Sequence, residues 1–209
     1  MSELLIYGAG GLGREIASSI SAFPNWRVMG FIDDNPVLKT VEGFPVFGGI
    51  DKLKEIDNYV NLVVAVGDPV QKEKIVNQIK VFPNINFPSL VHPSVIILNK
   101  SSVKIGKGSI VNAGCILTTN ITISEHVLIN LNVTIGHDVV IGQFSSIMPG
   151  VNIAGSVFTE KAVLIGSGAG VLNGLKLGEY SRIGAGAVVT RSVSAGSTVI
   201  GIPAKNINN

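Results

Sequence analysis

His137 and Asp138 stand side by side in VTIGHDVVIG (133–142), a segment that otherwise holds only aliphatic residues, glycine and threonine. Imidazole is the side chain whose ordinary pKa lies closest to neutrality, so it is well suited to act as a general base. A carboxylate beside it can hold one tautomer of the ring and stabilise the imidazolium that forms. The pair therefore has the chemistry to remove a proton from an amine or a hydroxyl.

The pair lies inside a repeat of six residues. From Ile105 to Ile200 the sequence divides into 16 hexads, of which 14 begin with Ile, Leu or Val; the exceptions are Thr159 and Ala195. The fifth position is always Val, Ile, Leu, Ala, Ser or Cys. A period of six fits neither an α-helix nor an alternating strand, and it is typical of a triangular solenoid with one short strand and one corner per hexad.

The period also predicts where the two side chains point. In such a solenoid the first residue of each hexad points inward, and the third and fourth residues form the corner. His137 and Asp138 fill the third and fourth positions, so we expect both to project outward. Other corners carry polar residues too, so by position alone a solvated corner is the simpler interpretation of the pair.

Residues 1–90 have a different hydrophobic pattern, in which short apolar runs alternate with segments of helical periodicity. Alternating strands and helices predict a small parallel α/β sheet. We therefore expect two domains, 1–90 and 91–209, with the repeat beginning near residues 92–93. This start is chosen because Val91, Ile97 and Val103 continue the phase of the fifth position backwards. The apolar runs lie at 4–8, 27–32, 45–47 and 61–67, and the helical patterns at 11–23 and 69–82.

The segment from Gly8 to Gly13 reads GAGGLG and satisfies GxGxxG between an expected strand and an expected helix. Asp33 follows 20 residues after Gly13. This pattern is typical of a helix amino terminus that faces phosphates, with a carboxylate on a ribose. The first 90 residues are long enough for only half of a dinucleotide-binding fold, which argues against a dinucleotide cofactor. A nicotinamide-dependent oxidoreductase remains an alternative. A capped turn explains Asp33 and Asp34 equally well.

Composition excludes several classes of protein. The net charge of +2 is too small to indicate binding to nucleic acid or to an anionic membrane. Cys115 is the only cysteine, so no intrachain disulfide can form. The first residues lack the pattern of a signal peptide, and no apolar run approaches the roughly 18 residues of a membrane span. We expect a soluble cytoplasmic protein without a nucleic-acid or membrane partner.

The whole chain resembles the bacterial hexapeptide-repeat sugar acetyltransferases related to sialic acid O-acetyltransferase and the nucleotide-amino-sugar N-acetyltransferases. The segments that carry the resemblance are GAGGLGRE, GFIDD, VHPS, GHDVVIG, IGAGAVVTRSV and GIPAK. The resemblance implies an α/β + β-solenoid fold: a small Rossmann-like N-terminal domain followed by a left-handed parallel β-helix. It also implies a homotrimer whose corners meet in clefts between chains.

The resemblance assigns roles at the corner. In that family the histidine matching His137 is the general base, and the acid matching Asp138, often a glutamate, assists it. Ser146 stands where the family often has a second histidine near the acetyl thioester. The N–H of Gly155 matches the position that holds the thioester carbonyl, which would make an oxyanion hole. From the sequence alone, a tight corner is the simpler interpretation of this glycine.

The resemblance also divides the ligands between the two domains. Acetyl-CoA would lie in a cleft between two β-helices, and the nucleotide sugar on the N-terminal domain. Gly10, Gly11 and Leu12 would face its phosphates, with Asp33 and Asp34 on the uridine or the sugar and Gly67 in the same crevice. The residues expected to contact acetyl-CoA are Ser146, Gly155, Ser167, Ala185, Arg191 and Lys205.

These observations predict an acetyl-CoA-dependent N-acetyltransferase that acts on a nucleotide-activated, UDP-linked amino sugar in bacterial surface glycan biosynthesis. O-acetylation of sialic acid or a related sugar is an alternative, since the same base serves a hydroxyl. An alternative of another class is a non-catalytic, nucleotide-binding trimeric scaffold. We expect no metal, because a hexapeptide-repeat carbonic anhydrase needs three metal-binding histidines and the sequence shows no matching pattern. His92 lies at the domain junction, and His126 cannot occupy a corner equivalent to that of His137.

Overall fold

The computed structural model describes residues 1–56 and 58–207, so positions 208–209 of the predicted second domain lie outside the described residues. The chain divides into two compact units. The first comprises Met1–Gly67 and Gln71–Pro88, and the second comprises Asp68–Val70 and Ser89–Asn209. Within the described part of the chain, no helix is long and apolar enough to cross a membrane.

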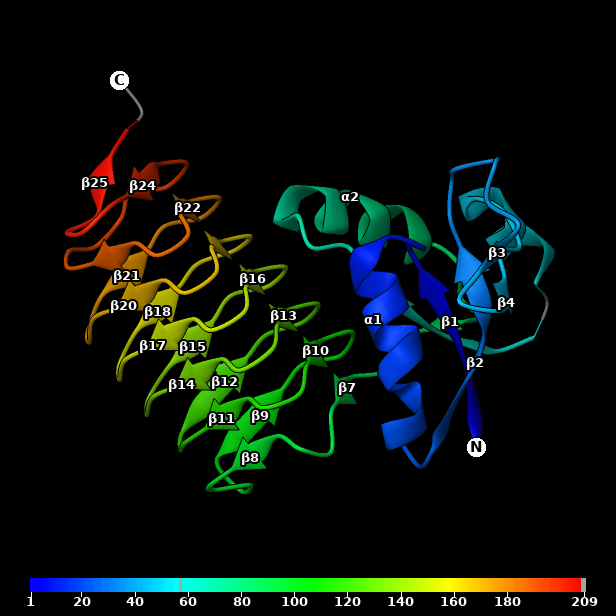
Figure 1. The fold of residues 1–209 in the computed structure, drawn as a ribbon, viewed down its shortest axis with the longest axis horizontal. Helices are drawn as coiled ribbons and strands as arrows, with labels where there is room; N and C mark the ends of the chain where they lie inside the picture. The colour runs from blue at the N-terminus through cyan, green and yellow to red at the C-terminus, as the bar shows by residue number, and fades with distance from the viewer. Residues whose placement is uncertain (57, 208–209) are drawn as a thin grey trace. The chain divides into compact units, whose positions relative to one another are not determined.

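The first unit is built on a four-stranded parallel sheet in the order β2-β1-β5-β6, of which Figure 1 labels β1 and β2. Helix α1 packs against β1. The centre of the sheet is apolar, since Leu4, Ile6 and Leu62 have no exposed surface. The elements are β1 (Ser2–Tyr7), α1 (Gly11–Ser19), η1 (Ile20–Ala22), β2 (Trp26–Ile32), β3 (Thr40–Val41), β4 (Phe44–Pro45), η2 (Ile50–Glu55), β5 (Val60–Val64), α2 (Pro69–Ile79) and β6 (Ile85–Asn86).

The elements expected in this half are present, with one difference. The run expected as a third strand at 45–47 forms only β4, which pairs antiparallel with β3 as a small hairpin. Val46 adds a single parallel bridge to Phe31 of β2. The remaining three strands and both helices lie where apolar periodicity predicts them.

The second unit is a β-solenoid whose coils stack one on the next, as Figure 1 shows. Its short strands form three parallel sheets, each named here after its first strand. The β7 sheet contains β7 (Leu90–Val91), β10 (Ile110–Val111), β13 (Leu128–Ile129), β16 (Ser146–Ile147), β19 (Leu164–Ile165), β22 (Arg182–Ile183), β24 (Thr198–Ile200) and the antiparallel β25 (Lys205–Asn206). The β8 sheet contains β8 (Ile96–Ile97), β11 (Ile116–Leu117), β14 (Thr134–Ile135), β17 (Asn152–Ile153), β20 (Gly170–Val171) and β23 (Val188–Val189). The β9 sheet contains β9 (Val103–Ile105), β12 (Ile121–Ile123), β15 (Val140–Ile141), β18 (Phe158–Thr159) and β21 (Lys176–Leu177).

Three hexads complete one coil, as the period predicts. Strand pairs join residues 18 apart, for example Ile129 with Ile147 and Ile147 with Ile165. These first-position residues have no exposed surface and line the core of the solenoid. The predicted fold class, an α/β domain followed by a β-solenoid, is therefore the observed one.

At both ends of the repeat, the strand pairing differs from the hexad phase that the sequence predicts. Val91 and Ile97 pair with the first-position residues Val111 and Leu117, 20 residues away, so both are first-position residues and not fifth-position ones. The corner that follows Ile97 is therefore two residues longer than the others. At the other end, Ile183 pairs with Val199, only 16 residues away, so the last coil is two residues shorter.

Candidate active site and nucleotide pocket

The corners between the β8 sheet and the β9 sheet stack into a column, called here the His137 column. Backbone bonds join its levels: the Asp138 N–H donates to the Thr119 carbonyl at 3.2 Å, and the Ser156 N–H donates to the His137 carbonyl at 2.8 Å. The Gly174 N–H likewise donates to the Gly155 carbonyl at 3.0 Å. Its third and fourth positions are, level by level, Thr119 and Asn120, His137 and Asp138, Gly155 and Ser156, and Asn173 and Gly174.

His137 and Asp138 form a hydrogen-bonded pair on the outside of the solenoid, as their hexad positions predict. The Nδ1 atom of His137 lies 2.7 Å from Oδ2 of Asp138, and the two side chains are 63% and 49% exposed. A second donor, Nδ2 of Asn120, bonds to the other carboxylate oxygen. The Asn120 hydrogen bond, followed by the bond from His137, lowers the pKa of the Asp138 carboxyl below its usual range. The arrangement leaves Nε2 of the imidazole available to a ligand.

Gly155 lies directly against the imidazole. A β-carbon added to this glycine would be 2.4 Å from Nε2 of His137 and 2.5 Å from Cε1, so only glycine leaves room for the ring. Among the described residues the Gly155 N–H donates to no acceptor, and the same is true of the N–H groups of Thr119 and His137. An unpaired third-position N–H is thus common in these corners; what distinguishes Gly155 is the histidine nitrogen next to it.

The other residues expected to contact acetyl-CoA lie in several places on the chain. Ser167 and Ala185 belong to a different column, between the β7 and β8 sheets, where the Gly186 N–H donates to the Ser167 carbonyl at 2.8 Å. Arg191 is exposed in the shortened corner at the end of the His137 column, and Lys205 is exposed on β25.

Ser146 differs from the rest of this set. It lies on β16 in the β7 sheet, and its side chain has no exposed surface. Within one chain, the structure does not bring it to the corner that carries His137.

The other two histidines contact neighbouring residues of the solenoid. His126 is buried and stacks on Phe144 with ring centroids 5.5 Å apart, in a corner between the β9 and β7 sheets. Nδ1 of His92 lies 2.8 Å from Oγ of Ser94. In the described residues there is no group of three or more His, Cys, Asp or Glu side chains that could hold a metal ion.

The glycine-rich segment of the first unit covers the loop from β1 to α1 and the first residues of α1, and it contains two kinds of glycine. A β-carbon on Gly13 would lie 1.9 Å from the Gly8 carbonyl oxygen, so this glycine is required by the packing of the loop. Gly10 and Gly11 are exposed, and a β-carbon on either would meet nothing within 4 Å. Gly10 and Gly11, with Leu12, therefore open the helix amino terminus to approach by a ligand.

Asp33 and Asp34 follow β2 and bond to neighbouring loops. Oδ2 of Asp33 accepts the Ala9 N–H at 2.7 Å, and its Oδ1 accepts the Asn35 N–H at 2.9 Å. Asp34 accepts the Ile50 N–H at 2.9 Å and the hydroxyl of Tyr7. Burial, then the hydrogen bond to Asp34, raises the pKa of the Tyr7 hydroxyl. The two carboxylates thus already order the edge of the sheet, which is the role expected of a capped turn.

A pocket of about 480 Å³ opens beside Asp34. The other residues that line this pocket were not identified from the sequence, and four of them come from one face of α2. Their spacing of three and four residues along an expected helix was the available signal. Gly67 follows β5, so it lies at the same carboxyl edge of the sheet as the glycine-rich loop and Asp33. The lining residues are Asp34, Ile50, Gln71, Lys74, Ile75 and Gln78.

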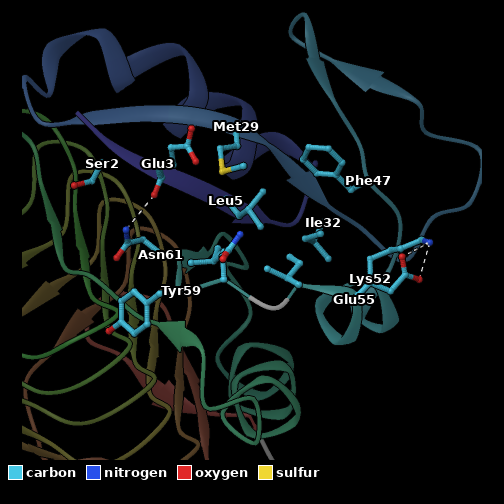
Figure 2. Close-up of a pocket in the computed structure, with 13 residues that line it drawn as sticks. Ser2, Glu3, Leu5, Met29, Ile32, Phe47, Lys52, Glu55, Tyr59 and Asn61 are labelled. Carbon is cyan, nitrogen blue, oxygen red and sulfur yellow. Dashed lines mark hydrogen bonds and ion pairs between the residues drawn. The ribbon is translucent and has the colours of Figure 1, made fainter.

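A larger pocket of about 660 Å³ lies elsewhere in the first unit, among β1, β2 and β5 (Figure 2). None of the predicted site residues lines it. Its polar groups are largely occupied by one another, since Lys52 pairs with Glu55 at 2.8 Å and Nδ2 of Asn61 donates to the Glu3 carbonyl at 3.1 Å, as Figure 2 shows. The smaller pocket, by contrast, is lined by Asp34, which is one of the predicted site residues.

Sequence comparison connects this arrangement to known proteins. Residues 3–79 match the family of the PglD N-terminal domain. The chain is 30% identical over 215 residues to the GDP-perosamine N-acetyltransferase of Escherichia coli O157:H7, a match that covers 97% of this chain and 95% of the relative.

Other curated relatives are matched over part of their length. The chain is 34% identical to a serine acetyltransferase of Buchnera aphidicola, covering 54% of this chain and 40% of that protein. It is also 34% identical to a UDP-3-O-acylglucosamine N-acyltransferase of Methylorubrum extorquens, covering 53% of this chain and 31% of that protein. The chain thus spans well under half the length of these two relatives.

Two solved structures share the whole fold. The acetyltransferase domain of PglB from Neisseria gonorrhoeae FA1090 superposes with a TM-score of 0.92 at 29% identity and covers 99% of this chain and 100% of that chain. PerB from Caulobacter crescentus, solved in complex with CoA and GDP-perosamine, superposes with a TM-score of 0.91 at 28% identity, covering 100% and 98%.

Proposed function

The chain belongs to the sugar acetyltransferase family that includes the GDP-perosamine N-acetyltransferase of Escherichia coli O157:H7, and we propose that it transfers an acetyl group from acetyl-CoA to the amine of a nucleotide-linked amino sugar. The observation that carries the proposal is the His137 pair. Its Nδ1 is hydrogen-bonded to Asp138 at 2.7 Å, and its Nε2 lies against Gly155, whose N–H donates to no acceptor in the part of the chain that the structure describes. Acyl transfer requires a general base and an oxyanion donor that lie close to the same reacting carbonyl.

In the proposed reaction the sugar amine attacks the thioester carbonyl carbon while Nε2 of His137 removes a proton from the amine. A carbon–nitrogen bond forms, and the Gly155 N–H donates to the oxyanion of the tetrahedral intermediate. The carbon–sulfur bond then breaks, and the proton passes from His137 to the leaving CoA thiolate. Asp138 keeps Nδ1 protonated throughout, which fixes the tautomer and stabilises the imidazolium. The step needs neither a metal nor a covalent enzyme intermediate.

We propose that the site is completed by a second copy of the chain in a homotrimer. Three of the residues expected to contact acetyl-CoA lie on two corner columns of one solenoid: Gly155 in the His137 column, and Ser167 with Ala185 between the β7 and β8 sheets. Two corners of one triangular coil point in different directions. A single ligand that touches both kinds of corner therefore has to lie between two copies.

The nucleotide belongs to the proposal as well. A uridine nucleotide is the expectation from the sequence, whereas one relative is named a GDP-perosamine N-acetyltransferase and another was solved with GDP-perosamine bound. The pocket beside Asp34 offers Gln71, Lys74 and Gln78 to whichever base is bound. The acetylated product stays linked to its nucleotide, so it can serve as a sugar donor in the assembly of a surface glycan.

The test is a direct assay of acceptors. The protein is incubated with acetyl-CoA and, separately, GDP-perosamine, a UDP-linked amino sugar and free sialic acid, while thiol release and product mass are followed. We expect thiol release with a nucleotide-linked amine, and one of the two nucleotides to be preferred. Acetylation of sialic acid alone would support the O-acetyltransferase alternative. Nucleotide binding without thiol release from any acceptor would support the non-catalytic scaffold.

A further inference from the structure

Asn120 belongs to the His137 column, and the proposed reaction assigns it no role. It occupies the fourth position of its hexad, 18 residues and therefore one coil before Asp138. Its Nδ2 donates to Oδ1 of Asp138, while Oδ2 of the same carboxylate bonds to Nδ1 of His137 at 2.7 Å. The three side chains thus form one continuous chain of hydrogen bonds from the lower corner to the imidazole.

The backbone holds Asn120 ready for this contact. Its φ is +53°, in the left-handed region that asparagine adopts more readily than most residues. Its own N–H donates to Oγ of Ser102 at 2.9 Å, and that hydroxyl lies 3.0 Å from Oγ1 of Thr119. Ser102 belongs to the corner that is two residues longer than the others, so the additional length supplies the group that anchors Asn120.

The carboxylate needs such a partner because it is exposed. An aspartate side chain on a surface corner rotates freely about its last bond, and water competes for both of its oxygens. Donors on both oxygens leave one orientation, in which Oδ2 faces Nδ1 of His137. The Asn120 bond also contributes most to the lowered pKa of the Asp138 carboxyl, so it favours the charged form that holds the imidazole.

We propose that Asn120 is a positioning residue of the His137 and Asp138 pair: its amide orients the carboxylate, which keeps Nδ1 of His137 protonated and Nε2 free to accept the substrate proton. The inference rests on the proposed acetyl transfer, since it assigns Asn120 to the base of that reaction. Asn120 acts through Asp138 and is not itself expected to touch either substrate.

Two substitutions separate this role from a purely structural one. Asn120→Gly removes the amide without backbone strain, because glycine favours a positive φ. Asn120→Asp keeps the size of the side chain but replaces the donor by a second carboxylate that repels Asp138. Ala162→Gly is the matched control, since Ala162 is also a fourth-position residue with a positive φ, in a corner between the β9 and β7 sheets. We expect this control to leave turnover unchanged.

Turnover is measured with acetyl-CoA and GDP-perosamine. We expect Asn120→Gly to lower kcat about tenfold, less than the ~10²–10⁴ that positioned proton transfer contributes. Asn120→Asp should lower kcat further, and neither variant should change KM for either substrate by more than about twofold. In an Asp138→Asn background, Asn120→Gly should have little further effect, because residues that act as a unit are not additive. Independent, multiplying effects of the two substitutions would overturn the proposal.

A second readout does not depend on turnover. Nitrogen NMR of the ¹⁵N-histidine-labelled protein reports which ring nitrogen of neutral His137 carries the proton. We expect the Nδ1–H tautomer in the wild type and a mixture of tautomers in Asn120→Gly. If the tautomer is unchanged in Asn120→Gly, Asn120 does not position the pair. If wild-type protein shows the Nδ1–H tautomer but transfers no acetyl group, the proposed function fails while the positioning role stands.

Discussion

The imidazole of His137 occupies the space that a side chain on Gly155 would fill. The two residues sit one above the other on successive coils, and a β-carbon on Gly155 would approach Nε2 of His137 to 2.4 Å. The ring therefore lies against backbone that carries no side chain, at the residue whose N–H we propose as the oxyanion donor. The position of the base depends on the absence of a side chain at residue 155.

We expect Gly155→Ala to lower kcat by roughly a hundredfold, the loss that follows when a reacting group is displaced by about 1 Å. The added methyl group has to push the imidazole away from the donor. Gly170→Ala is the control, since a β-carbon there meets nothing within 4 Å and its backbone is not strained. Both variants should keep the wild-type unfolding temperature within a few degrees. Wild-type turnover in Gly155→Ala would show that the ring does not work from this position.

His137→Ala should lower kcat by about 10²–10⁴, because the positioned proton transfer is lost. The side chain is 63% exposed, so its removal leaves no cavity in the core of the solenoid. Asp138→Asn should cost less, since it weakens the support of the base and leaves the base in place. Steady-state kinetics on GDP-perosamine measure the loss, and circular dichroism checks the fold. A His137→Ala variant with nearly full activity would contradict the mechanism.

The pKa of Asp138 makes a prediction for the pH profile. The hydrogen bonds from Asn120 and His137 lower the pKa of this carboxyl, so the bonded, charged form is present above its ordinary value of about 3.9 and is lost only as pH falls below it. Between pH 5 and 9 its charge is constant, and it cannot produce the acidic fall in activity there. In Asp138→Asn we expect any acidic limb of kcat/KM above pH 5 to persist, because Asp138 does not titrate in that range. A limb that disappears would mean that Asp138 itself is the titrating base.

Small-angle scattering tests the homotrimer. We expect the molecular mass in solution to be three times that of the 21.8 kDa chain. In mixing experiments, trimers assembled from His137→Ala and a variant defective at the Ser167 and Ala185 corner should regain activity, because some sites then contain two intact halves. A monomer with full activity would contradict a shared site.

Much of the candidate active site could be predicted from the hexad period, because the period alone places the third and fourth positions outward. The stacking of Asn120 on Asp138 could be predicted as well. The two residues share a hexad position and lie one coil of 18 residues apart, so stacking follows from the repeat. What the pattern lacked was any sign that two neighbouring corners bond through their side chains.

The ends of the repeat could not be predicted, for a physical reason. A shift of two residues exchanges the first position of a hexad with the fifth, and both positions accept a small aliphatic side chain. Val91 and Ile97 therefore fit either phase, and so does Val199. Ala195 was the one sign of the shorter last coil, since alanine begins its hexad and is exposed in the structure.

The division of ligands between the two units gives the last prediction. Gly10 and Gly11 are open to solvent, whereas Gly13 packs against the Gly8 carbonyl. Gly10→Val should therefore leave the first unit folded and crowd the phosphates at the amino terminus of α1. We expect it to weaken binding of GDP-perosamine at least tenfold and to leave acetyl-CoA binding nearly unchanged, as measured by calorimetry with each ligand.

Gly13→Ala is the contrasting variant for the same loop. Its β-carbon would come within 1.9 Å of a backbone oxygen, so it should lower the unfolding temperature as well as the affinity for GDP-perosamine. If Gly10→Val lost both ligands without a change in stability, the two would share one binding surface. If it lost acetyl-CoA alone, the glycine-rich loop would hold the CoA and not the nucleotide sugar. Selective loss of the nucleotide sugar, with the fold intact, is the outcome expected if the open amino terminus of α1 holds its phosphates.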